Sequence, residues 1–399
     1  MQDYNLKSAD RTKNIRYAIR DIIVVADEVA KTGKELLYLN IGDPNVYDHK
    51  TPEHVVEAVY KAMKDNKNGY SASSGITEGR EAIRRYAERK GIKNIQDIFI
   101  TTGASEAIEI VLTSLLNRGD NFLMPTPGYP LYTAIQSKLE LEPNPYFLNE
   151  ENDWQPDLED IRKKINPRTK AIALINPNNP TGALFSKEVL QGIIDIAKEF
   201  NLLILCDEIY DQLIFDGQKH ISLASLDSEV PCVTFSGLSK NYVCPGFRIG
   251  WGVVSGNAER LKDFLAGVNR ILRSRLCANH PIQWAIKPAL EGPQEHLHNL
   301  VKTLERRRDL SYNLIKKIPQ MSLVKPTGAF YALPSVYVKD DTKFSIDLLK
   351  ATGVITVPGS GFGEKPGTSH FRFVILPQEE VLEKAFNLIG DFLSSYKQD

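Results

Sequence analysis

Short apolar segments alternate with amphipathic stretches between residues 98 and 254, and this alternation constrains the fold more than any other feature of the sequence. Several segments are continuous apolar runs, as expected of strands that are covered on both faces of a sheet. The alternation predicts an α/β fold built on a doubly wound, mostly parallel sheet. The expected strands are Asp97–Thr101, Asn121–Pro125, Pro145–Leu148, Lys170–Ile175, Leu202–Cys206, Cys232–Phe235 and Ile249–Val254.

Helices are expected between these strands. Ser105 is a candidate N-cap for one of them, and Ser186 precedes another. From about residue 255 to 317 the pattern is mainly helical. Strand-like pieces then return before a final amphipathic helix, which predicts a second, smaller α+β domain.

The domain boundaries follow from this change of pattern. We expect residues 46–290 to form a large domain, and residues 1–45 together with 291–399 to form the small one. With 399 residues the chain is long enough for two domains, and 42% hydrophobic residues exclude a disordered, collagen-like or coiled-coil chain.

Charge, cysteine content and hydropathy narrow the range of partners. A formal net charge of -1 argues against nucleic acid as a partner, and the basic run Arg306–Arg308 is expected to be a solvated helix face with local ion pairs. Four cysteines without a C-x-x-C pair predict no metal site. The polar N-terminus and the lack of a long apolar segment predict a cytoplasmic protein without membrane association.

Chemically distinctive residues follow several of the expected strands, and the carboxyl ends of such strands are where α/β sheets bind ligands. The turn at Ala104 and Ser105 precedes a helix, so it is either a phosphate site at a helix N-terminus or a plain turn with a serine cap. Tyr129 lies between Gly128 and Pro130, where it either presents its ring to a flat ligand or packs within the turn.

The next two strand ends add polar groups. In the segment Asn176–Gly182 (NPNNPTG), Asn179 can donate to an oxygen in the cleft, and a cis bond to Pro180 would direct its side chain. Asp207 ends an apolar strand and is followed by Tyr210 in the motif DEIY. A buried aspartate is costly unless it meets a cation or a donor, although a helix N-cap is an alternative role.

The last strand end carries Lys240 in the motif SGLSK, with Arg248 eight residues later. Lys240 is either a surface lysine or a desolvated amine whose lowered pKa lets it react with an aldehyde. Pyridoxal phosphate needs such an amine, an acid for its ring nitrogen, donors for its phenolic oxygen, a site for its phosphate and a face for its ring. The successive strand ends offer all of these groups.

The sequence resembles the class I/II aminotransferases, which are pyridoxal-phosphate enzymes of fold type I. The resemblance covers essentially the whole chain and rests on NPNNPTG, DEIYD, SGLSK and GFRIGW in that order. The alanine aminotransferase branch is the most similar, because of the segments Tyr17–Asp21 (YAIRD), Asp153–Asp157 (DWQPD) and Arg275–Asn279 (RLCAN).

The resemblance implies a role for each matching residue. Lys240 takes the place of the Schiff-base lysine and, with Asp207 and Tyr210, is implied to be catalytic. The implied ligands of the pyridoxal 5′-phosphate cofactor are Ala104, Ser105, Tyr129, Asn179, Asp207, Tyr210, Lys240, Arg248 and, from the other subunit of a homodimer with shared active sites, Tyr70. The implied substrate-binding residues are Gly42, Asn179 and Arg372.

The chain departs from some relatives just before Lys240. The position three residues earlier, a phosphate-binding serine in those relatives, is Gly237, so Ser236 and Ser239 are both candidates for the phosphate contact. Strand alternation places Arg372 on one face, opposite its two phenylalanine neighbours, so that its guanidinium can bind a carboxylate. His370, two residues before Arg372, is expected to be a spectator.

The resemblance implies ping-pong transamination between amino acids and 2-oxo acids, with alanine and 2-oxoglutarate giving pyruvate and glutamate. Arg20 is a candidate mobile cation for the second carboxylate of glutamate, with a surface ion pair as the alternative. Transamination of aspartate or aromatic amino acids remains the nearest alternative. A nicotinamide dehydrogenase is disfavoured because the sequence has no G-x-G-x-x-G motif.

Overall fold

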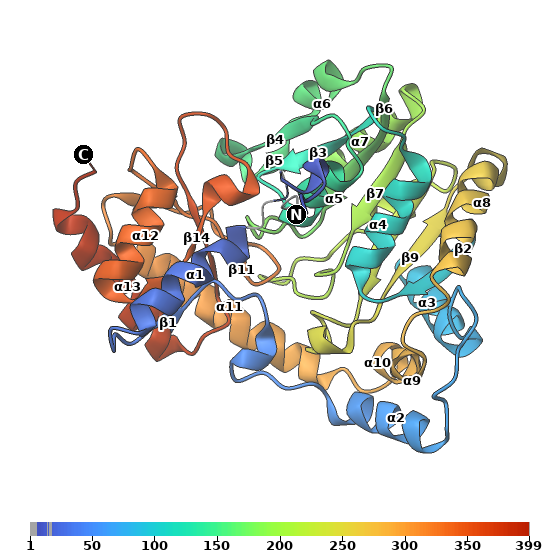
Figure 1. Ribbon diagram of the computed structural model, residues 1–399, viewed down its shortest axis with the longest axis horizontal. Coiled ribbons are helices and arrows are strands. Elements are labelled where there is room, and N and C mark those ends of the chain that lie inside the picture. The colour runs from blue at the N-terminus through green and yellow to red at the C-terminus, as the bar shows by residue number, and fades with distance from the viewer. Residues whose placement is uncertain (1–5, 14, 16–17, 399) are drawn as a thin grey trace, which may run out of the picture.

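The computed structural model describes residues 6–13, 15 and 18–398, without the side chains of residues 18–21. Its centre is an eight-stranded sheet in the order β2-β9-β8-β7-β6-β3-β4-β5 (Figure 1). The strands from β8 to β4 in this order are parallel, whereas β9 pairs antiparallel with β2 and β8, and β5 with β4. The strands are β2 (Ile95–Thr101), β3 (Asn121–Thr126), β4 (Pro145–Asn149), β5 (Gln155–Pro156), β6 (Thr169–Ile175), β7 (Leu203–Asp207), β8 (Cys232–Gly237) and β9 (Gly250–Ser255).

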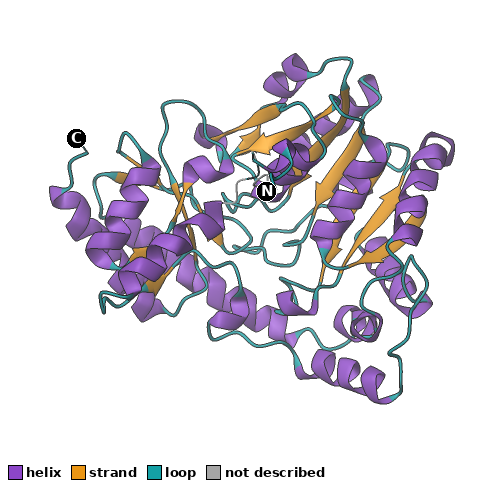
Figure 2. Cartoon of the chain, viewed as in Figure 1, coloured by secondary structure: helices purple, strands orange, loops and turns teal. Residues whose placement is uncertain are grey.

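Helices cover both faces of this sheet, as Figure 2 shows, so the predicted doubly wound, mostly parallel sheet is confirmed. Alternate residues of each strand belong to different cores: Ile172 and Leu174 of β6 pack on one face, and Ala173 on the other. One face is covered by α2 (Glu53–Lys64), α3 (Thr77–Arg89), α6 (Leu158–Lys164), α7 (Lys187–Glu199) and α10 (Ile286–Glu291), near the short α9 (His280–Gln283). The other is covered by α4 (Ala104–Leu115), α5 (Pro130–Lys138) and α8 (Ala258–Ser274).

A second group of elements lies beside the large sheet, on the left of Figure 1, and joins the two ends of the chain. Its helices are α1 (Ala18–Ala30), α11 (Glu295–Ile315), α12 (Asp341–Thr352) and α13 (Glu379–Ser395). Strand β1 (Leu37–Tyr38) pairs with β13 (Val354–Ile355), β10 (Met321–Ser322) with β12 (Ser335–Val336), and β15 (Phe371–Val374) lies between β11 (Tyr331–Ala332) and β14 (Val357–Pro358). The predicted apolar face of the final helix is confirmed, because Phe386 of α13 packs on Phe373 of β15 with ring centroids 5.0 Å apart.

The two predicted helix caps have different outcomes. Ser186 caps α7 as expected, because its side chain accepts a hydrogen bond from the Val189 N–H. The prediction for Ser105 was wrong: α4 already begins at Ala104, and the N-cap is Gly103 with φ of +83°. A glycine has no side chain with which to cap the helix, so the N–H groups of its first turn remain available to a ligand.

The prediction of a solvated basic face with local ion pairs in α11 was right only in part. Arg306 is exposed, and Arg308 pairs with the neighbouring Asp309. Arg307 and Arg308, however, are only 2% and 1% exposed. Their burial depends on Asp48 and Asp216, which the local sequence does not reveal because they come from distant segments. Among the residues that the structure describes, no helix has the length and apolar character needed to cross a bilayer.

Candidate active site

A cavity of about 140 Å³ lies at the carboxyl end of the parallel strands and collects most of the predicted site residues. The residues that line it come from the ends of β6, β7 and β8 and from the starts of α4 and α5. Those predicted from the sequence are Ala104, Ser105, Tyr129, Asn179, Asp207, Tyr210, Ser239, Lys240 and Arg248. The strand ends that are far apart in sequence therefore converge on one site, as the topology of such sheets requires.

One end of the cavity suits an anion. The uncapped first turn of α4 brings the N–H groups of Ala104 and Ser105 to the cavity wall. Arg248, with φ of +53°, lies against this turn: a Cβ at position 103 would be 2.4 Å from its Nη2 atom, so only glycine allows the approach. A helix N-terminus and a guanidinium that meet at one point can hold an anion such as a phosphate group.

Asp207 supplies a buried carboxylate at the end of β7. Its side chain is almost fully buried, and its Oδ1 atom accepts a hydrogen bond of 3.2 Å from the Ile209 N–H. Burial raises the pKa of Asp207 to about 7, although the nearby Lys240 amine opposes the rise. Such a carboxyl is stabilised as an anion when a cationic group enters the cavity, which is what the protonated nitrogen of a pyridine ring provides.

Lys240 lies just beyond β8, and its Nζ atom donates a hydrogen bond of 2.8 Å to the Gly42 carbonyl. Burial lowers the pKa of Lys240 to about 8. The positive charges of Arg372 and Arg248 lower it further, whereas Asp43 opposes the shift. A substantial fraction of this amine is therefore neutral near physiological pH, as a nucleophile or a general base must be.

Tyr210, Asn179 and Tyr129 complete the polar and aromatic lining. The Tyr210 hydroxyl donates to the Tyr331 hydroxyl at 3.1 Å. Asn179 precedes Pro180 through a cis peptide bond, as predicted, and its Oδ1 atom accepts a hydrogen bond of 3.3 Å from Arg372. Tyr129 immediately precedes α5, and its ring is held at the cavity wall.

Arg372 lies behind Asn179, outside the group of residues that line the cavity. Its guanidinium is almost fully buried between the rings of Tyr331 and Phe362, with centroid distances of 4.5 and 4.9 Å. Its Nη2 atom also donates a hydrogen bond of 2.7 Å to the Asn40 carbonyl. These contacts fix the plane of the guanidinium, and a guanidinium held in this way can bind a carboxylate through two hydrogen bonds.

The structure separates some of the other predicted residues from the cavity. Tyr70 is 82% exposed in the loop after α2 and is remote from the lining of this chain's own cavity. Of the two serines, Ser239 lines the cavity and Ser236 is buried within β8. Gly42 contacts Lys240 through its carbonyl oxygen. Arg20 lies in α1, and its side chain is outside the described residues.

Tyr331 is a lining residue with a polar group that the sequence analysis missed. It contacts both Tyr210 and Arg372, and its hydroxyl would lie 2.4 Å from a Cβ at position 42, so the residue there must be glycine. Tyr331 lies in β11 of the second group of elements, 121 residues after Tyr210. No sequence motif places it there.

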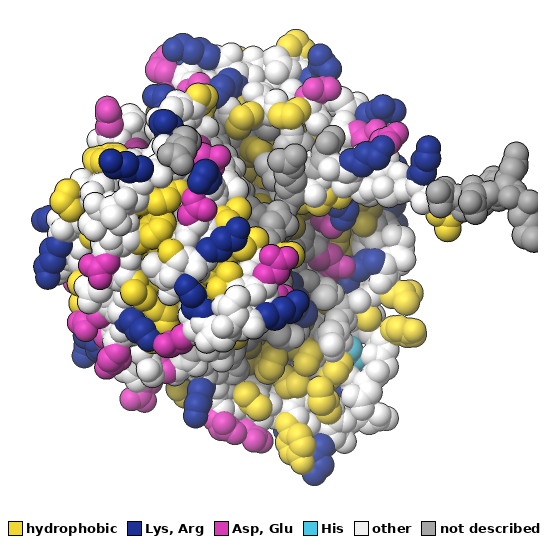
Figure 3. All heavy atoms as spheres, turned by 60° about the vertical axis from the view of Figure 1, so that its left-hand side comes forward, with side chains coloured by type: hydrophobic (Ala, Val, Ile, Leu, Met, Phe, Trp, Pro, Cys, Tyr) yellow, Lys and Arg dark blue, Asp and Glu magenta, His cyan; other side chains and the backbone are white. Residues whose placement is uncertain are grey.

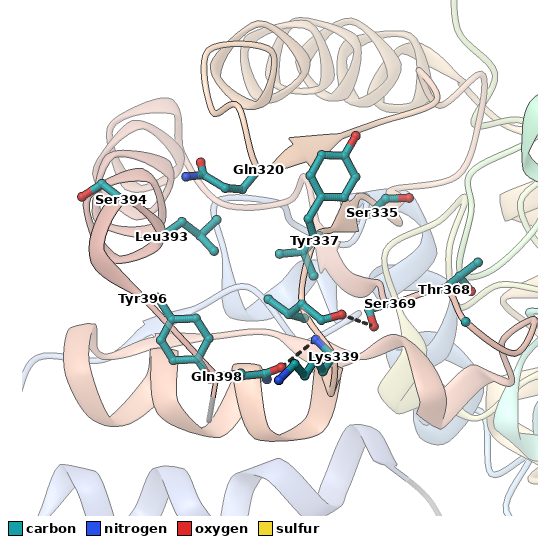
Figure 4. Close-up of a pocket in the computed structure, with 13 residues that line it drawn as sticks. Gln320, Ser335, Tyr337, Lys339, Thr368, Ser369, Leu393, Ser394, Tyr396 and Gln398 are labelled. Carbon is teal, nitrogen blue, oxygen red and sulfur yellow. Dashed lines mark hydrogen bonds between the residues drawn. The ribbon is translucent and has the colours of Figure 1, made fainter.

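Two other features of the structure lie outside this site. Behind Asp207, the Lys90 amine contacts the carboxylates of Glu208 and Asp211 at 2.5 and 2.6 Å and forms a buried ion-pair network with them. A hollow of about 570 Å³ lies between the segments around Tyr337, Thr368 and Tyr396 of the second group (Figure 4). Its lining contains none of the predicted site residues.

The helix N-terminus with Arg248, the buried Asp207 carboxyl, the Lys240 amine of lowered pKa and the Tyr129 ring all line one cavity. This set of groups fits pyridoxal 5′-phosphate. The fold and the site together define a pyridoxal-phosphate enzyme of fold type I. Residues 34–389 match the family model described as aminotransferase class I and II. The chain belongs to this family and is therefore an aminotransferase that depends on pyridoxal phosphate.

Similar proteins agree with this assignment over nearly the full length. The glutamate-pyruvate aminotransferase AlaA of Escherichia coli is 38% identical, with 98% of this chain and 99% of the relative covered. An alanine aminotransferase of Mycobacterium tuberculosis is 39% identical, with 97% and 92% covered. The solved structure of an alanine aminotransferase from Pyrococcus furiosus superposes with a TM-score of 0.94 at 41% identity, covering 98% of this chain and 100% of that one.

Proposed function

We propose that this aminotransferase exchanges the amino group between alanine and 2-oxoglutarate, giving pyruvate and glutamate in two half-reactions. The observation that carries the proposal is the full-length similarity to relatives named for this reaction, at 38 to 41% identity. Lys240 and Asp207 line one cavity, and Arg372 contacts its lining residue Asn179, an arrangement that supports the chemistry of both half-reactions.

Each residue of the site is proposed to contact a different part of the cofactor. When bound, pyridoxal phosphate supplies an aldehyde for the amino group and a ring that draws electrons from the substrate Cα atom. Asp207 keeps a proton on the ring nitrogen, because an anion at close range favours the cationic form. Tyr210 and Asn179 donate to the phenolic oxygen, Tyr129 covers the ring, and Ala104, Ser105, Ser239 and Arg248 hold the phosphate; we assign Ser236 a supporting position within β8.

Arg372 binds the α-carboxylate of each substrate and thereby orients its Cα–H bond. With the cofactor bound, the Lys240 amine would accept the proton from the substrate Cα atom and return it on the cofactor side. The lowered pKa of Lys240 suits both steps, since the same group must accept a proton and then release it. Arg20 is proposed to pair with the second carboxylate of glutamate and to turn away when alanine binds.

We also propose that the active sites are shared within a homodimer. Hydrophobic side chains are exposed on the outer side of α2, where Val56, Tyr60 and Met63 are 37%, 55% and 45% exposed, and Tyr70 follows in the next loop. Figure 3 shows hydrophobic side chains gathered at the bottom of the molecule, where α2 lies. A second copy that covers this face would take Tyr70 to its own cofactor phosphate.

We also propose a role for each domain and a location for the protein. Residues 46–290 are proposed to bind the cofactor, and residues 1–45 with 291–399 to clamp the substrate. The absence of a suitable membrane-spanning helix among the described residues is compatible with a location in the cytoplasm, which we propose.

The test of the function is a comparison of amino donors with 2-oxoglutarate as acceptor. We expect alanine to give the highest kcat/KM, stoichiometric pyruvate and glutamate, and parallel lines in double-reciprocal plots, as a ping-pong reaction requires. Faster turnover of aspartate, tyrosine or phenylalanine would contradict the proposed substrate pair and leave the family assignment intact. Aspartate is the donor to compare most carefully, because a protein of Methanocaldococcus jannaschii named a probable aspartate aminotransferase is 34% identical to this chain.

A further inference from the structure

His370 is enclosed by acidic groups from two different parts of the molecule. Its side chain is 2% exposed. The Nε2 atom lies 3.1 Å from Glu150 Oε2, and the Nδ1 atom lies 3.1 Å from Glu364 Oε1. Glu150 follows β4 at the edge of the large sheet, whereas Glu364 lies in the loop before β15. The ring therefore links the two groups of elements.

The geometry favours a charged imidazole. A ring nitrogen that faces an ionised carboxylate donates to it, so a ring between two ionised carboxylates carries both protons. The Ser335 hydroxyl also lies 3.0 Å from the Nε2 atom. Burial lowers the pKa of His370, but the hydrogen bonds with Glu150 and Glu364 outweigh it and raise the pKa to about 9. The Ser335 hydroxyl, drawn in Figure 4, donates to the second oxygen of Glu150 at 2.7 Å and holds that carboxylate in place.

The two carboxylates respond differently to this environment. The bonds with His370 and Ser335 overcome the effect of burial and lower the pKa of Glu150. Burial raises the pKa of Glu364, and the charge of Asp341 adds to the rise. The His370–Glu150 contact is therefore the principal ion pair, and it is the one that joins the small sheet to the large one.

The strand that contains Arg372 begins just after His370. Because the two residues are two positions apart, they share one face, and the intervening Phe371 points to the other, where it packs on Phe344 at a centroid distance of 5.8 Å. On the shared face Arg372 contacts Asn179 and His370 contacts Glu150. Each cation thus reaches a residue that follows a strand of the large sheet.

The segment Asp153–Asp157 contributes to the same contact. The Trp154 ring, 4% exposed, lies edge-on to the His370 ring with centroids 5.5 Å apart. The backbone N–H of Trp154 donates a hydrogen bond of 2.8 Å to the Asn149 carbonyl, which folds the segment back over the ion pair. By excluding water on this side, Trp154 strengthens the attraction between His370 and Glu150.

A hollow of about 300 Å³ on the remaining side contains the other charged groups near His370. Its lining includes the acids Glu151, Asp157 and Asp160 and the base Lys365. Lys164 pairs with Asp160 at 2.7 Å, so Glu151 and Asp157 remain as the further acids against Lys365. The excess of acid favours the protonated ring. Within the described lining of this hollow, Glu150 and Glu364 are the acids in direct contact with His370.

We propose that His370 is a positioning residue for Arg372: clamped between Glu150 and Glu364, it fixes the strand that presents Arg372 against the edge of the large sheet. The inference rests on the proposed role of Arg372 as the α-carboxylate clamp. Without the His370–Glu150 contact, β15 would be held by its neighbours β11 and β14 but no longer fixed to the large sheet at its start. Arg372 would then meet the carboxylate in a wider range of positions, and binding would weaken before the chemical step did.

The test is the KM of the holoenzyme for 2-oxo acids, which have no titrating amino group. His370→Gln, which cannot be charged, should raise the KM for pyruvate and for 2-oxoglutarate about 10-fold and change kcat less than 3-fold. The KM of the unchanged enzyme should rise above about pH 9, as His370 loses its proton, whereas the KM of His370→Gln should lack this rise. Glu150→Gln should resemble His370→Gln, and the control Glu151→Gln should resemble the unchanged enzyme.

The variant Arg372→Lys distinguishes failure of the positioning role of His370 from failure of the proposed role of Arg372. If Arg372→Lys raises KM and His370→Gln does not, the positioning role is overturned and the clamp remains. If neither variant alters KM, the role of Arg372 itself is wrong. In His370→Gln, a rise in KM accompanied by a comparable fall in kcat and by a lower melting temperature, with the pH profile unchanged, would show that His370 serves general stability. This outcome would also overturn the proposal.

Discussion

The amine of Lys240 donates a hydrogen bond of 2.8 Å to the backbone oxygen of Gly42, which is 198 residues earlier in the chain. Two positions before Gly42, the Asn40 carbonyl accepts a hydrogen bond of 2.7 Å from Arg372. One short segment therefore contacts both the group proposed to move the proton and the group proposed to bind the carboxylate. Such a shared support keeps the amine in a fixed relation to the substrate Cα atom.

Removing the charge of Asp207 should affect turnover more than cofactor binding. Asp207→Asn retains the shape of the side chain but cannot stabilise a cationic ring nitrogen, so we expect kcat to fall by about 100-fold or more. Cofactor occupancy, read from the visible absorbance of the purified protein, should remain above about half because the phosphate and ring contacts are unchanged.

The matched control for this variant is Asp195→Asn, on the exposed side of α7. It should leave kcat unchanged. Near-normal turnover of Asp207→Asn would remove Asp207 from the mechanism. Loss of the cofactor in parallel with activity would show instead that Asp207 acts mainly in binding.

The pKa of Lys240 sets the pH dependence of reconstitution from apoenzyme. Only the neutral amine reacts with the cofactor aldehyde, and burial lowers the pKa of Lys240 to about 8. The rate of pyridoxal phosphate incorporation should therefore rise between pH 7 and 8 and level off above pH 8 to 9. Arg372→Gln should move the midpoint upward, because removing a neighbouring positive charge favours the protonated amine.

Stopped-flow absorbance measures this rate directly. A rate that continues to increase towards pH 10.5, the ordinary pKa of lysine, would show that the amine is not desolvated. An unchanged midpoint in Arg372→Gln would show that the charge of Arg372 does not reach Lys240.

Tyr70 tests whether the sites are shared between subunits. Lys240→Ala and Tyr70→Ala are each expected to have low activity as homodimers. In a hybrid dimer, the subunit with an intact Lys240 would receive an intact Tyr70 from its neighbour, so one site of the two would recover. Refolding an equal mixture should restore about a quarter of normal activity, since about half of the dimers would be hybrids.

The outcome distinguishes two arrangements. Sites built within one chain would give no recovery in the mixture. Full activity of a monomer, established by light scattering at the assay concentration, would contradict the proposed dimer as well.

Arg20 and Arg372 should differ in the substrates they affect. Arg372→Ala should raise the KM for alanine, pyruvate, glutamate and 2-oxoglutarate alike, by about 100-fold, because each has an α-carboxylate. Arg20→Ala should raise the KM for the two dicarboxylates at least about 10-fold and leave alanine and pyruvate nearly unchanged. Equal effects of Arg20→Ala on both pairs would contradict the mobile cation.

The sequence alone predicts the large sheet well for a physical reason. Strands buried on both faces must be continuous apolar runs, so the run Lys170–Ile175 predicts β6 to within one residue. The ends of these runs also predict which polar residues meet, because parallel strands end at one edge. Asp207 and Lys240 are therefore found together in one cavity without any knowledge of distant contacts.

Residues whose roles depend on distant segments could not be predicted in this way. Tyr331 reaches the cavity from β11, and Arg307 is buried because Asp48 lies opposite it. His370 was expected to be a spectator, yet it contacts Glu150 across 220 positions of sequence. A local pattern gives the face on which such a side chain lies but not the partner that it meets.

The central claim is that Lys240 is the amine that reacts with the cofactor, and borohydride reduction of the holoenzyme tests it most directly. The reagent joins the cofactor permanently to the lysine that holds it, and peptide mass spectrometry locates the modified residue. We predict one pyridoxyl phosphate group per chain, on Lys240, and its loss in Lys240→Ala. Attachment at another lysine, with Lys240 unmodified in an active preparation, would contradict the account.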